Sequence, residues 1–267
     1  NIDINVKEAV FLNSQTEEKG ADEHAGTAGV LAVNAERITI GPGETQFSGF
    51  QTIGFNSDYN FTASGKGLLD TGNAALNIVS ALVTGTFSLD SDSYEALDFT
   101  INSGNGKISL ESNGNNAEAN DNIGGSLVFK ANQIENSSDI LLNSGVIGFI
   151  ATGNLSGAGI DMKDGSSVTA QGSRYLKADG TYEYFDAGQV YYQAENAAVR
   201  FGPGSITDVS AGEQNLTADA GTISVINGNG SFYIGLADLE PGESAAQLIA
   251  TANQGKGGRF ELDTGAF

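Results

Sequence analysis

Three aspartates that lie close together, Asp90, Asp92 and Asp98, are the residues whose type and spacing best suit a metal ion. Calcium binds about six to eight oxygen atoms in proteins, and carboxylates supply many of them. Alternating aspartate and serine is also ordinary in turns, because these side chains bond to nearby backbone amides. The three aspartates are therefore candidate calcium ligands, and we expect no other cofactor.

Tyrosines gather in the second half of the chain, at Tyr175, Tyr182, Tyr184, Tyr191 and Tyr192. A tyrosine ring has an apolar face and a polar edge, which suits contact with a sugar or with another protein. The same side chains could instead cover a protrusion and fill the end of the core. We take all five as candidate ligand-binding residues.

Paired carboxylates are the other chemistry that this acidic chain offers. Hydrolysis of a glycosidic bond needs two carboxyl groups about 5 to 9 Å apart across one cleft. Glu183 with Asp186, or Glu195 with Asp208, could supply such a pair, but nothing distinguishes either pair among the 33 acidic residues. We therefore expect no enzymatic activity, with a polysaccharide-degrading enzyme as an alternative.

The composition excludes several classes of function. The chain has no cysteine, which excludes thiol enzymes, disulfide scaffolds and cysteine-ligated metal sites. Its 33 acidic and 12 basic residues give a formal net charge of −21. This charge argues against nucleic acid as a partner, because the phosphate backbone must be neutralised by lysine and arginine. No apolar run approaches the roughly 20 residues that cross a bilayer, so we expect no membrane insertion.

The elements that must position these residues are short β-strands. Apolar and polar residues alternate at 107–110, 127–129 and 223–225, and a period of two is typical of a strand with one buried face. Clusters of glycine, asparagine, aspartate and serine separate the strands and permit sharp corners. Only residues 244–252 have helical propensity, and a strand with a corner fits them equally well.

A loose repeat runs through the chain. A small residue followed by hydrophobic–x–hydrophobic recurs at 106–110, 124–129, 187–192, 220–225 and 257–262. The spacing from Gly125 to Gly145 is 20 residues, which suits one winding of a solenoid. Stacked windings share an apolar interior that one winding could not bury alone. We expect about thirteen windings, and we prefer this fold to a β-sandwich of antiparallel hairpins.

Two stretches interrupt the alternation. Residues 14–25 are rich in charge, and we expect them to form a protruding loop. Residues 173–186 surround Asp179-Gly180, a dipeptide typical of tight hairpin turns, so we expect a short protruding hairpin there. Neither stretch has the composition of a linker, and we expect a single domain over residues 1–267.

The repeated phrases resemble those of the filamentous-haemagglutinin-like exoproteins of two-partner secretion. The resemblance is clearest at residues 187–194, 201–210, 220–225 and 257–263, and it covers residues 100–267 better than the first hundred. It implies an all-β, right-handed parallel β-helix that leaves a Gram-negative cell through a dedicated outer-membrane secretion pore. It also implies that the chain is a segment of a longer protein.

The sequence and the resemblance together favour an extracellular adhesin or biofilm matrix rod at the cell surface. Such a rod would present its loops to polysaccharide or to the surface of a host or sister cell. The acidic surface would keep rods apart, and divalent cations could let them bundle. A self-assembling fibre subunit is the other alternative, because the ends of a stack carry unpaired strand edges.

Overall fold

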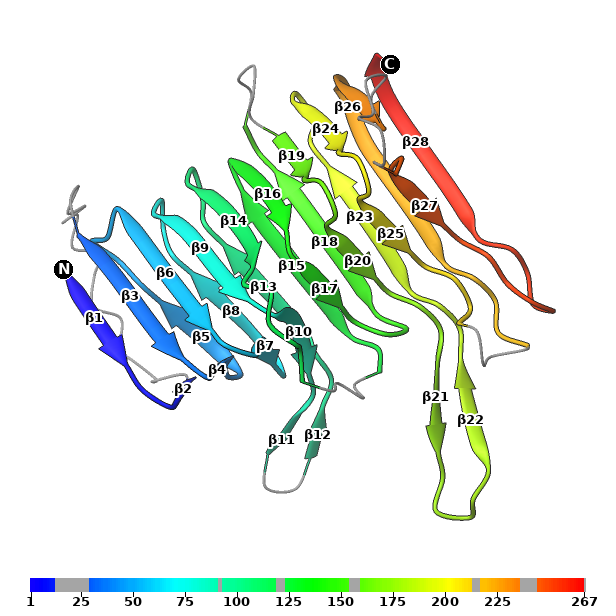
Figure 1. The fold of residues 1–267 in the computed structure, drawn as a ribbon, viewed down its shortest axis with the longest axis horizontal. Coiled ribbons are helices and arrows are strands. Elements are labelled where there is room, and N and C mark those ends of the chain that lie inside the picture. The colour runs from blue at the N-terminus through cyan, green and yellow to red at the C-terminus, as the bar shows by residue number, and fades with distance from the viewer. Residues whose placement is uncertain are drawn as a thin grey trace.

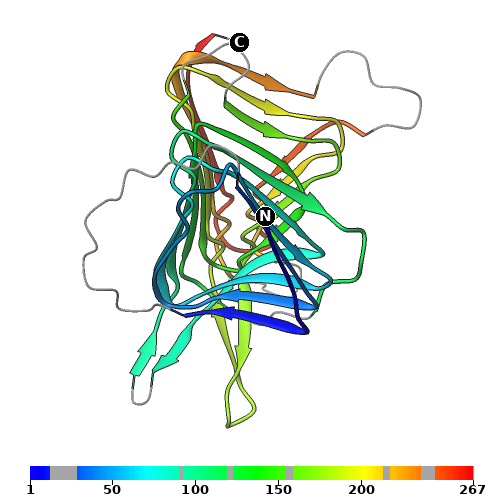
Figure 2. The same ribbon diagram turned by 90° about the vertical axis from the view of Figure 1, so that its left-hand side faces the viewer.

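The computed structural model describes residues 1–12, 29–90, 93–118, 123–153, 159–212, 217–235 and 244–266. Within these ranges every regular element is a β-strand. The chain winds around one axis and builds three flat faces, and Figure 2 shows the three-sided outline along that axis. Followed from the N-terminus in this view, it turns clockwise away from the reader, so the winding is right-handed. No helix in the described ranges is long and apolar enough to cross a membrane.

Each face is a parallel sheet to which successive windings contribute one strand. The first face consists of β1 (Ile2–Asn5), β3 (Val30–Ala35), β6 (Thr52–Ser57), β9 (Ala75–Ser80), β14 (Lys107–Ser112), β16 (Gln133–Ser137), β19 (Gly159–Met162), β24 (Ala198–Phe201) and the last residues of β26 (Thr222–Ile234). The second face consists of β2 (Glu8–Phe11), β4 (Arg37–Ile40), β7 (Asn60–Ser64), β10 (Leu82–Thr86), β17 (Asp139–Leu141), β20 (Ser167–Thr169), β25 (Ile206–Asp208) and β27 (Gln247–Ile249). The third face consists of β5 (Gly43–Gln46), β8 (Lys66–Asp70), β13 (Asp98–Asn102), β15 (Ser126–Ala131), β18 (Val146–Ala151), β23 (Gln189–Gln193), the first residues of β26 and β28 (Arg259–Ala266).

The parallel ladders confirm the solenoid and exclude the β-sandwich, whose strands would pair with antiparallel neighbours. The expected period holds for only part of the chain. Ser126 pairs with Val146, 20 residues later, but Val146 pairs with Gln189, 43 residues later. The windings differ in length because the chain makes excursions at the corners, so the expected thirteen windings are wrong. Residues 244–252 include β27 and form no helix.

The core is a set of apolar columns inside the prism. The alternation predicted from the sequence places every second side chain of a strand inward, and parallel register puts equivalent side chains one above another. Phe129, Phe149 and Tyr192 form one such column on the third face. Their rings are stacked at centroid distances of 5.4 and 5.1 Å, and all three side chains are fully buried.

In four of its five occurrences the small residue of the repeated phrase lies at the corner before the third face, whereas Gly106 precedes β14 on the first face. Gly145, Gly188, Gly221 and Gly258 precede successive strands there. A Cβ atom at Gly188 would lie 1.7 Å from the carbonyl oxygen of Gly145, and one at Gly221 would lie 1.8 Å from that of Gly188. The windings therefore approach too closely for a side chain at Gly188 and Gly221, which explains the recurrence of glycine at these positions.

One winding contributes no strand to the second face among the described residues. β10 pairs directly with β17, in the register of Val83 with Ile140, although β14 and β15 lie between them in the sequence. After β14 the chain instead runs back over earlier windings, and we call residues 113–118 the strap. Its Asn113 Nδ2 donates to the carbonyl oxygens of Ser57 and Asp58 at 2.7 and 3.0 Å.

An ion pair holds the far end of the strap. Glu118 accepts hydrogen bonds from the guanidinium of Arg37, and its backbone amide donates to Asn60 Oδ1 at 3.1 Å. Arg37 also lies 3.3 Å from Glu8 and over the ring of Tyr59. The bond from Arg37 lowers the pKa of Glu118 and raises that of Arg37. The strap thus ties three windings together with polar contacts.

Two hairpins project from the stack, both at the corner between the second and third faces (Figure 1). The first pairs β11 (Ser88–Asp90) with β12 (Ser93–Glu95). The second pairs β21 (Ser173–Leu176) with β22 (Tyr182–Phe185), which confirms the hairpin expected at 173–186. The loop expected at 14–25 lies outside the described residues.

Candidate functional site

The turn of the second hairpin is built by the residues that predicted it. Gly180 has a φ of 81°, which is available to glycine at little cost. Asp179 Oδ1 accepts hydrogen bonds from the backbone amide and the hydroxyl of Thr181, at 2.9 and 2.6 Å. These bonds lower the pKa of Asp179. Lys177 and Glu183 form an ion pair of 3.2 Å beside the turn, so the projecting strands have a defined geometry.

The hairpin exposes a group of large side chains. Three of the candidate tyrosines lie on it, and Tyr175, Tyr182 and Tyr184 are 58, 43 and 46% exposed. Leu176, which pairs with Tyr182, is 54% exposed. The guanidinium of Arg174 lies 4.3 Å from the centre of the Tyr182 ring, within the range of a cation–π contact. Leu176, Tyr182 and Tyr184 share one face of the hairpin with Arg174, because residues of both strands alternate with a period of two.

Tyr191 lies apart from the hairpin, on the outer surface of the third face. Its register partner is Gly148, and a Cβ atom there would lie 2.2 Å from Cζ of the Tyr191 ring. The ring therefore covers the backbone of Gly148 and is only half-buried. This cover raises the pKa of the Tyr191 hydroxyl. Gln189 and Gln193 flank it on the same side of β23.

Tyr192 is in the core, and its assignment as a surface ligand-binding residue is wrong. The side chain is 0% exposed, stacks on Phe149 and contacts Phe201 edge-on. Its hydroxyl forms a 2.6 Å hydrogen bond with the hydroxyl of the buried Thr207. Burial raises the pKa of Tyr192. The physical reason is the alternation itself, since Tyr191 and Tyr192 are neighbours and must point to opposite sides of the strand.

The three aspartates proposed for calcium are not assembled into a site within the described residues. Asp92 and the side chain of Asp90 lie outside them. Asp98 begins β13 with an exposed side chain, 4.0 Å from the ammonium of Lys66 in the adjacent strand. The described residues contain no group of three or more histidine, cysteine, aspartate or glutamate side chains that could hold a metal ion.

The carboxylate pairs considered for hydrolysis are separated or already engaged. Glu195 follows β23, at the corner between the third and first faces. Asp208 ends β25, at the corner between the second and third faces, and accepts a hydrogen bond of 2.6 Å from Gln171. Glu183 pairs with Lys177, and Asp186 accepts the backbone amide of Asp219.

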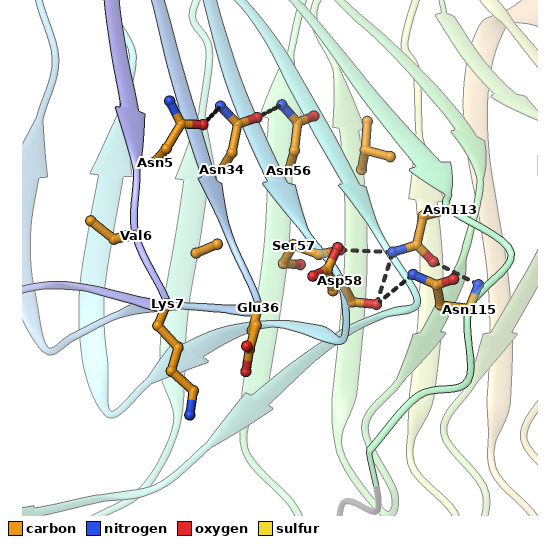
Figure 3. Close-up of a pocket in the computed structure, with 12 residues that line it drawn as sticks. Asn5, Val6, Lys7, Asn34, Glu36, Asn56, Ser57, Asp58, Asn113 and Asn115 are labelled. Atoms are coloured by element: carbon orange, nitrogen blue, oxygen red, sulfur yellow. Dashed lines mark hydrogen bonds between the residues drawn. The ribbon is translucent and has the colours of Figure 1, made fainter.

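A groove at the corner between the first and second faces was not found from the sequence. Its volume is about 590 Å³, and residues of the first windings and of the strap line it (Figure 3). Asn5, Asn34 and Asn56 form a row along one side, where each asparagine is the last or next-to-last residue of a strand of the first face. Asn56 Nδ2 donates to Asn34 Oδ1 at 2.7 Å, and Asn34 Nδ2 donates to Asn5 Oδ1 at 3.0 Å.

Asn5, Asn34 and Asn56 each follow two apolar residues that alternate with other residues, and this recurrence was a signal for the row. The register that aligns them was not readable, because the first two windings are 29 and 22 residues long by the pairings of Ile2 with Leu31 and Val30 with Thr52. The strap closes the groove at its other end with Asn113 and Asn115. Comparison with protein-family models, with curated proteins and with solved structures gives no match.

Proposed function

We propose that this protein is an extracellular attachment rod, which holds on to polysaccharide or to the surface of a host or sister cell. The observation that carries the proposal is the second hairpin, where Tyr175, Leu176, Tyr182 and Tyr184 are each 43 to 58% exposed. Eight other aromatic side chains among the described residues are buried in the core, whereas these expose apolar surface to water, which is unfavourable in the free protein. Exposed aromatic side chains that gather beside an arginine are typical of a contact surface.

The position of the hairpin supports the same function. It projects from the corner that also carries the first hairpin, so both lie along one edge of a stiff stack (Figure 1). A rod that displays projections along one edge can approach a large surface without interference from its faces. Export by two-partner secretion and a place in an adhesin or biofilm matrix are the parts of this proposal that rest on the sequence resemblance.

Binding to immobilised glycans and to whole cells tests the proposal. In a triple variant Tyr175→Ser, Tyr182→Ser and Tyr184→Ser, we expect at least tenfold weaker binding than in the wild-type protein. The matched control is Tyr59→Ser with Tyr233→Ser. These tyrosines are each 37% exposed and lie beside arginines, but they belong to the stack. Equal loss in both variants, or no binding by the wild-type protein to any glycan or cell, would contradict the proposal.

A further inference from the structure

The groove beside the strap is polar along its sides and apolar at its floor. Val6, which is 44% exposed, lies between the row of asparagines and Lys7 (Figure 3). Ala35 and Val79 are the other apolar residues of the lining. A volume of about 590 Å³ lies within the range of roughly 300 to 1,000 Å³ that is usual for small-molecule sites. A fitting ligand must therefore have a weakly apolar side as well as polar edges.

The asparagine row leaves specific hydrogen-bonding groups free at the groove. Asn34 uses both N–H groups of its amide, on Asn5 and on Asp3. Asn56 ends the row, because the next residue in register is Val79, which cannot continue it. Within the described residues one N–H and the carbonyl oxygen of the Asn56 amide have no partner.

The strap repeats this chemistry beside the end of the row. Asn115 Nδ2 donates one N–H to the carbonyl oxygen of Asp58, and its own Oδ1 has no partner among the described residues. An amide both donates and accepts hydrogen bonds, as a hydroxyl group does. The free amide groups of Asn56 on the row and of Asn115 on the strap therefore suit a ligand that carries hydroxyl groups along its edges.

The charged residues of the lining, one lysine and two acidic residues, leave an excess of one negative charge and restrict the class of ligand. Lys7 forms no ion pair within the described residues, and Glu36 and Asp58 are the acidic side chains of the lining. The whole chain has a net charge of −21, which repels polyanions at long range. These features favour an uncharged ligand over an acidic one.

We infer that this groove is a binding site for a segment of a neutral oligosaccharide. The C–H faces of the sugar rings lie against Val6, Ala35 and Val79. Ring hydroxyls exchange hydrogen bonds with the amides of Asn56 and Asn115. The site is distinct from the hairpin, lies on another corner of the stack, and does not depend on the attachment function proposed for the tyrosines.

Calorimetric titration of the purified protein tests the site, with cellotriose, maltotriose, mannotriose and triacetylchitotriose as neutral probes and sialyllactose as an acidic one. We expect at least one neutral trisaccharide to bind in the millimolar range or more tightly, and the acidic probe to bind at least tenfold more weakly. If no neutral probe binds at millimolar concentration, or if sialyllactose binds best, the inference is overturned.

Two matched pairs of variants locate the binding. Val6→Phe fills the floor of the groove, whereas Val10→Phe enlarges another exposed valine of the same winding that does not line it. Asn56→Leu removes the free amide, whereas Asn102→Leu removes an asparagine near the end of a strand of the third face, where its Nδ2 donates to Asp70. We expect at least tenfold weaker binding in the first member of each pair and unchanged binding in the second.

The outcomes separate this inference from the proposed function. The triple tyrosine variant should retain full affinity for the trisaccharide, and Val6→Phe should retain attachment to the hairpin-dependent surface. Equal losses of trisaccharide affinity in Val6→Phe and Val10→Phe would overturn the inference about the groove and leave the proposed attachment function standing. Because Val6 is on the surface, Val6→Phe should keep the far-ultraviolet circular dichroism of the wild-type protein. Its trisaccharide affinity therefore tests the groove even if Asn56→Leu unfolds.

Discussion

A methyl group added to a glycine at the corner before the third face should be among the small changes that destabilise this protein most. In Gly188→Ala the new Cβ atom would lie 1.7 Å from the carbonyl oxygen of Gly145, where an ordinary contact is 3.4–4 Å. It would also lie 2.7 Å from the carbonyl carbon and the nitrogen of Gly145. These are backbone atoms within a ladder, so two windings must separate to relieve the contact.

The cost follows from the hydrogen bonds at that corner. Gln189 donates to the carbonyl of Gly145 at 2.9 Å, and Thr222 donates to that of Gly188 at 3.2 Å. Loss of two such bonds costs about 2 kcal/mol at a net of about 1 kcal/mol each. Overpacking adds about 1–3 kcal/mol, and alanine returns about 0.4–1 kcal/mol through the entropy of the unfolded chain. We expect a net loss of about 2–4 kcal/mol, which lowers Tm by roughly 5–15 °C in a protein of this size.

Gly228→Ala is the matched control, because a Cβ atom there meets nothing within 4 Å and its φ is outside the left-handed region. It should change the free energy of unfolding by less than about 1 kcal/mol. Thermal melting followed by circular dichroism gives the first comparison. Since stacked windings can open separately, hydrogen exchange at Gln189 should report the local loss directly. Equal Tm values for the two variants would refute the argument that the corner excludes side chains.

Further predictions concern the buried tyrosine and the strap. Tyr192→Phe leaves the buried Thr207 hydroxyl unpaired and should lower the free energy of unfolding by about 1–3 kcal/mol in chemical denaturation. Adding Thr207→Val should recover most of that loss, and additive losses in the double variant would argue against the hydrogen bond. Because burial raises the pKa of Tyr192, Tyr192→Phe and wild type should show the same rise in ultraviolet absorbance on titration to about pH 11, and a smaller rise in the variant would contradict this. The pKa of Glu118 is below its ordinary 4.5, so the stabilisation it gives is complete above that pH and is lost as the pH falls through the lowered value. The protection of the amides of residues 113–118 against exchange, taken relative to the intrinsic rate at each pH, should therefore be high at neutral pH and fall in stronger acid. Glu118→Gln should lower this protection already at neutral pH, and unchanged protection in that variant would exclude Arg37 as the anchor.

Local patterns predicted those parts of the fold that local physics controls. Alternation places residues such as Ile223 and Val225 inward, and Asp179-Gly180 predicts a hairpin with the turn that the structure has. The same alternation contained the answer for Tyr192, which follows Val190 with the inward period. The error came from treating the tyrosines as a compositional cluster and not as positions on a strand.

Other features depend on register, which a single sequence does not reveal. The row of Asn5, Asn34 and Asn56 forms only because windings of unequal length align their strand ends. The strap depends on a contact between Arg37 and Glu118, 81 residues apart, with no periodic signal between them. Part of the predicted calcium site, and the loop expected at 14–25, fall outside the described residues.

The direct pairing of β10 with β17 has a geometric effect on the whole stack. The first and third faces each have a strand from the intervening winding, β14 and β15, and the second face has none there. That side is therefore shorter by about one strand spacing, roughly 4.8 Å. A prism with one short side cannot have parallel end planes, so its axis must lean toward the second face at this level. The edge that carries both hairpins borders this shortened side, and the lean brings the roots of the two projections closer together than in a straight prism.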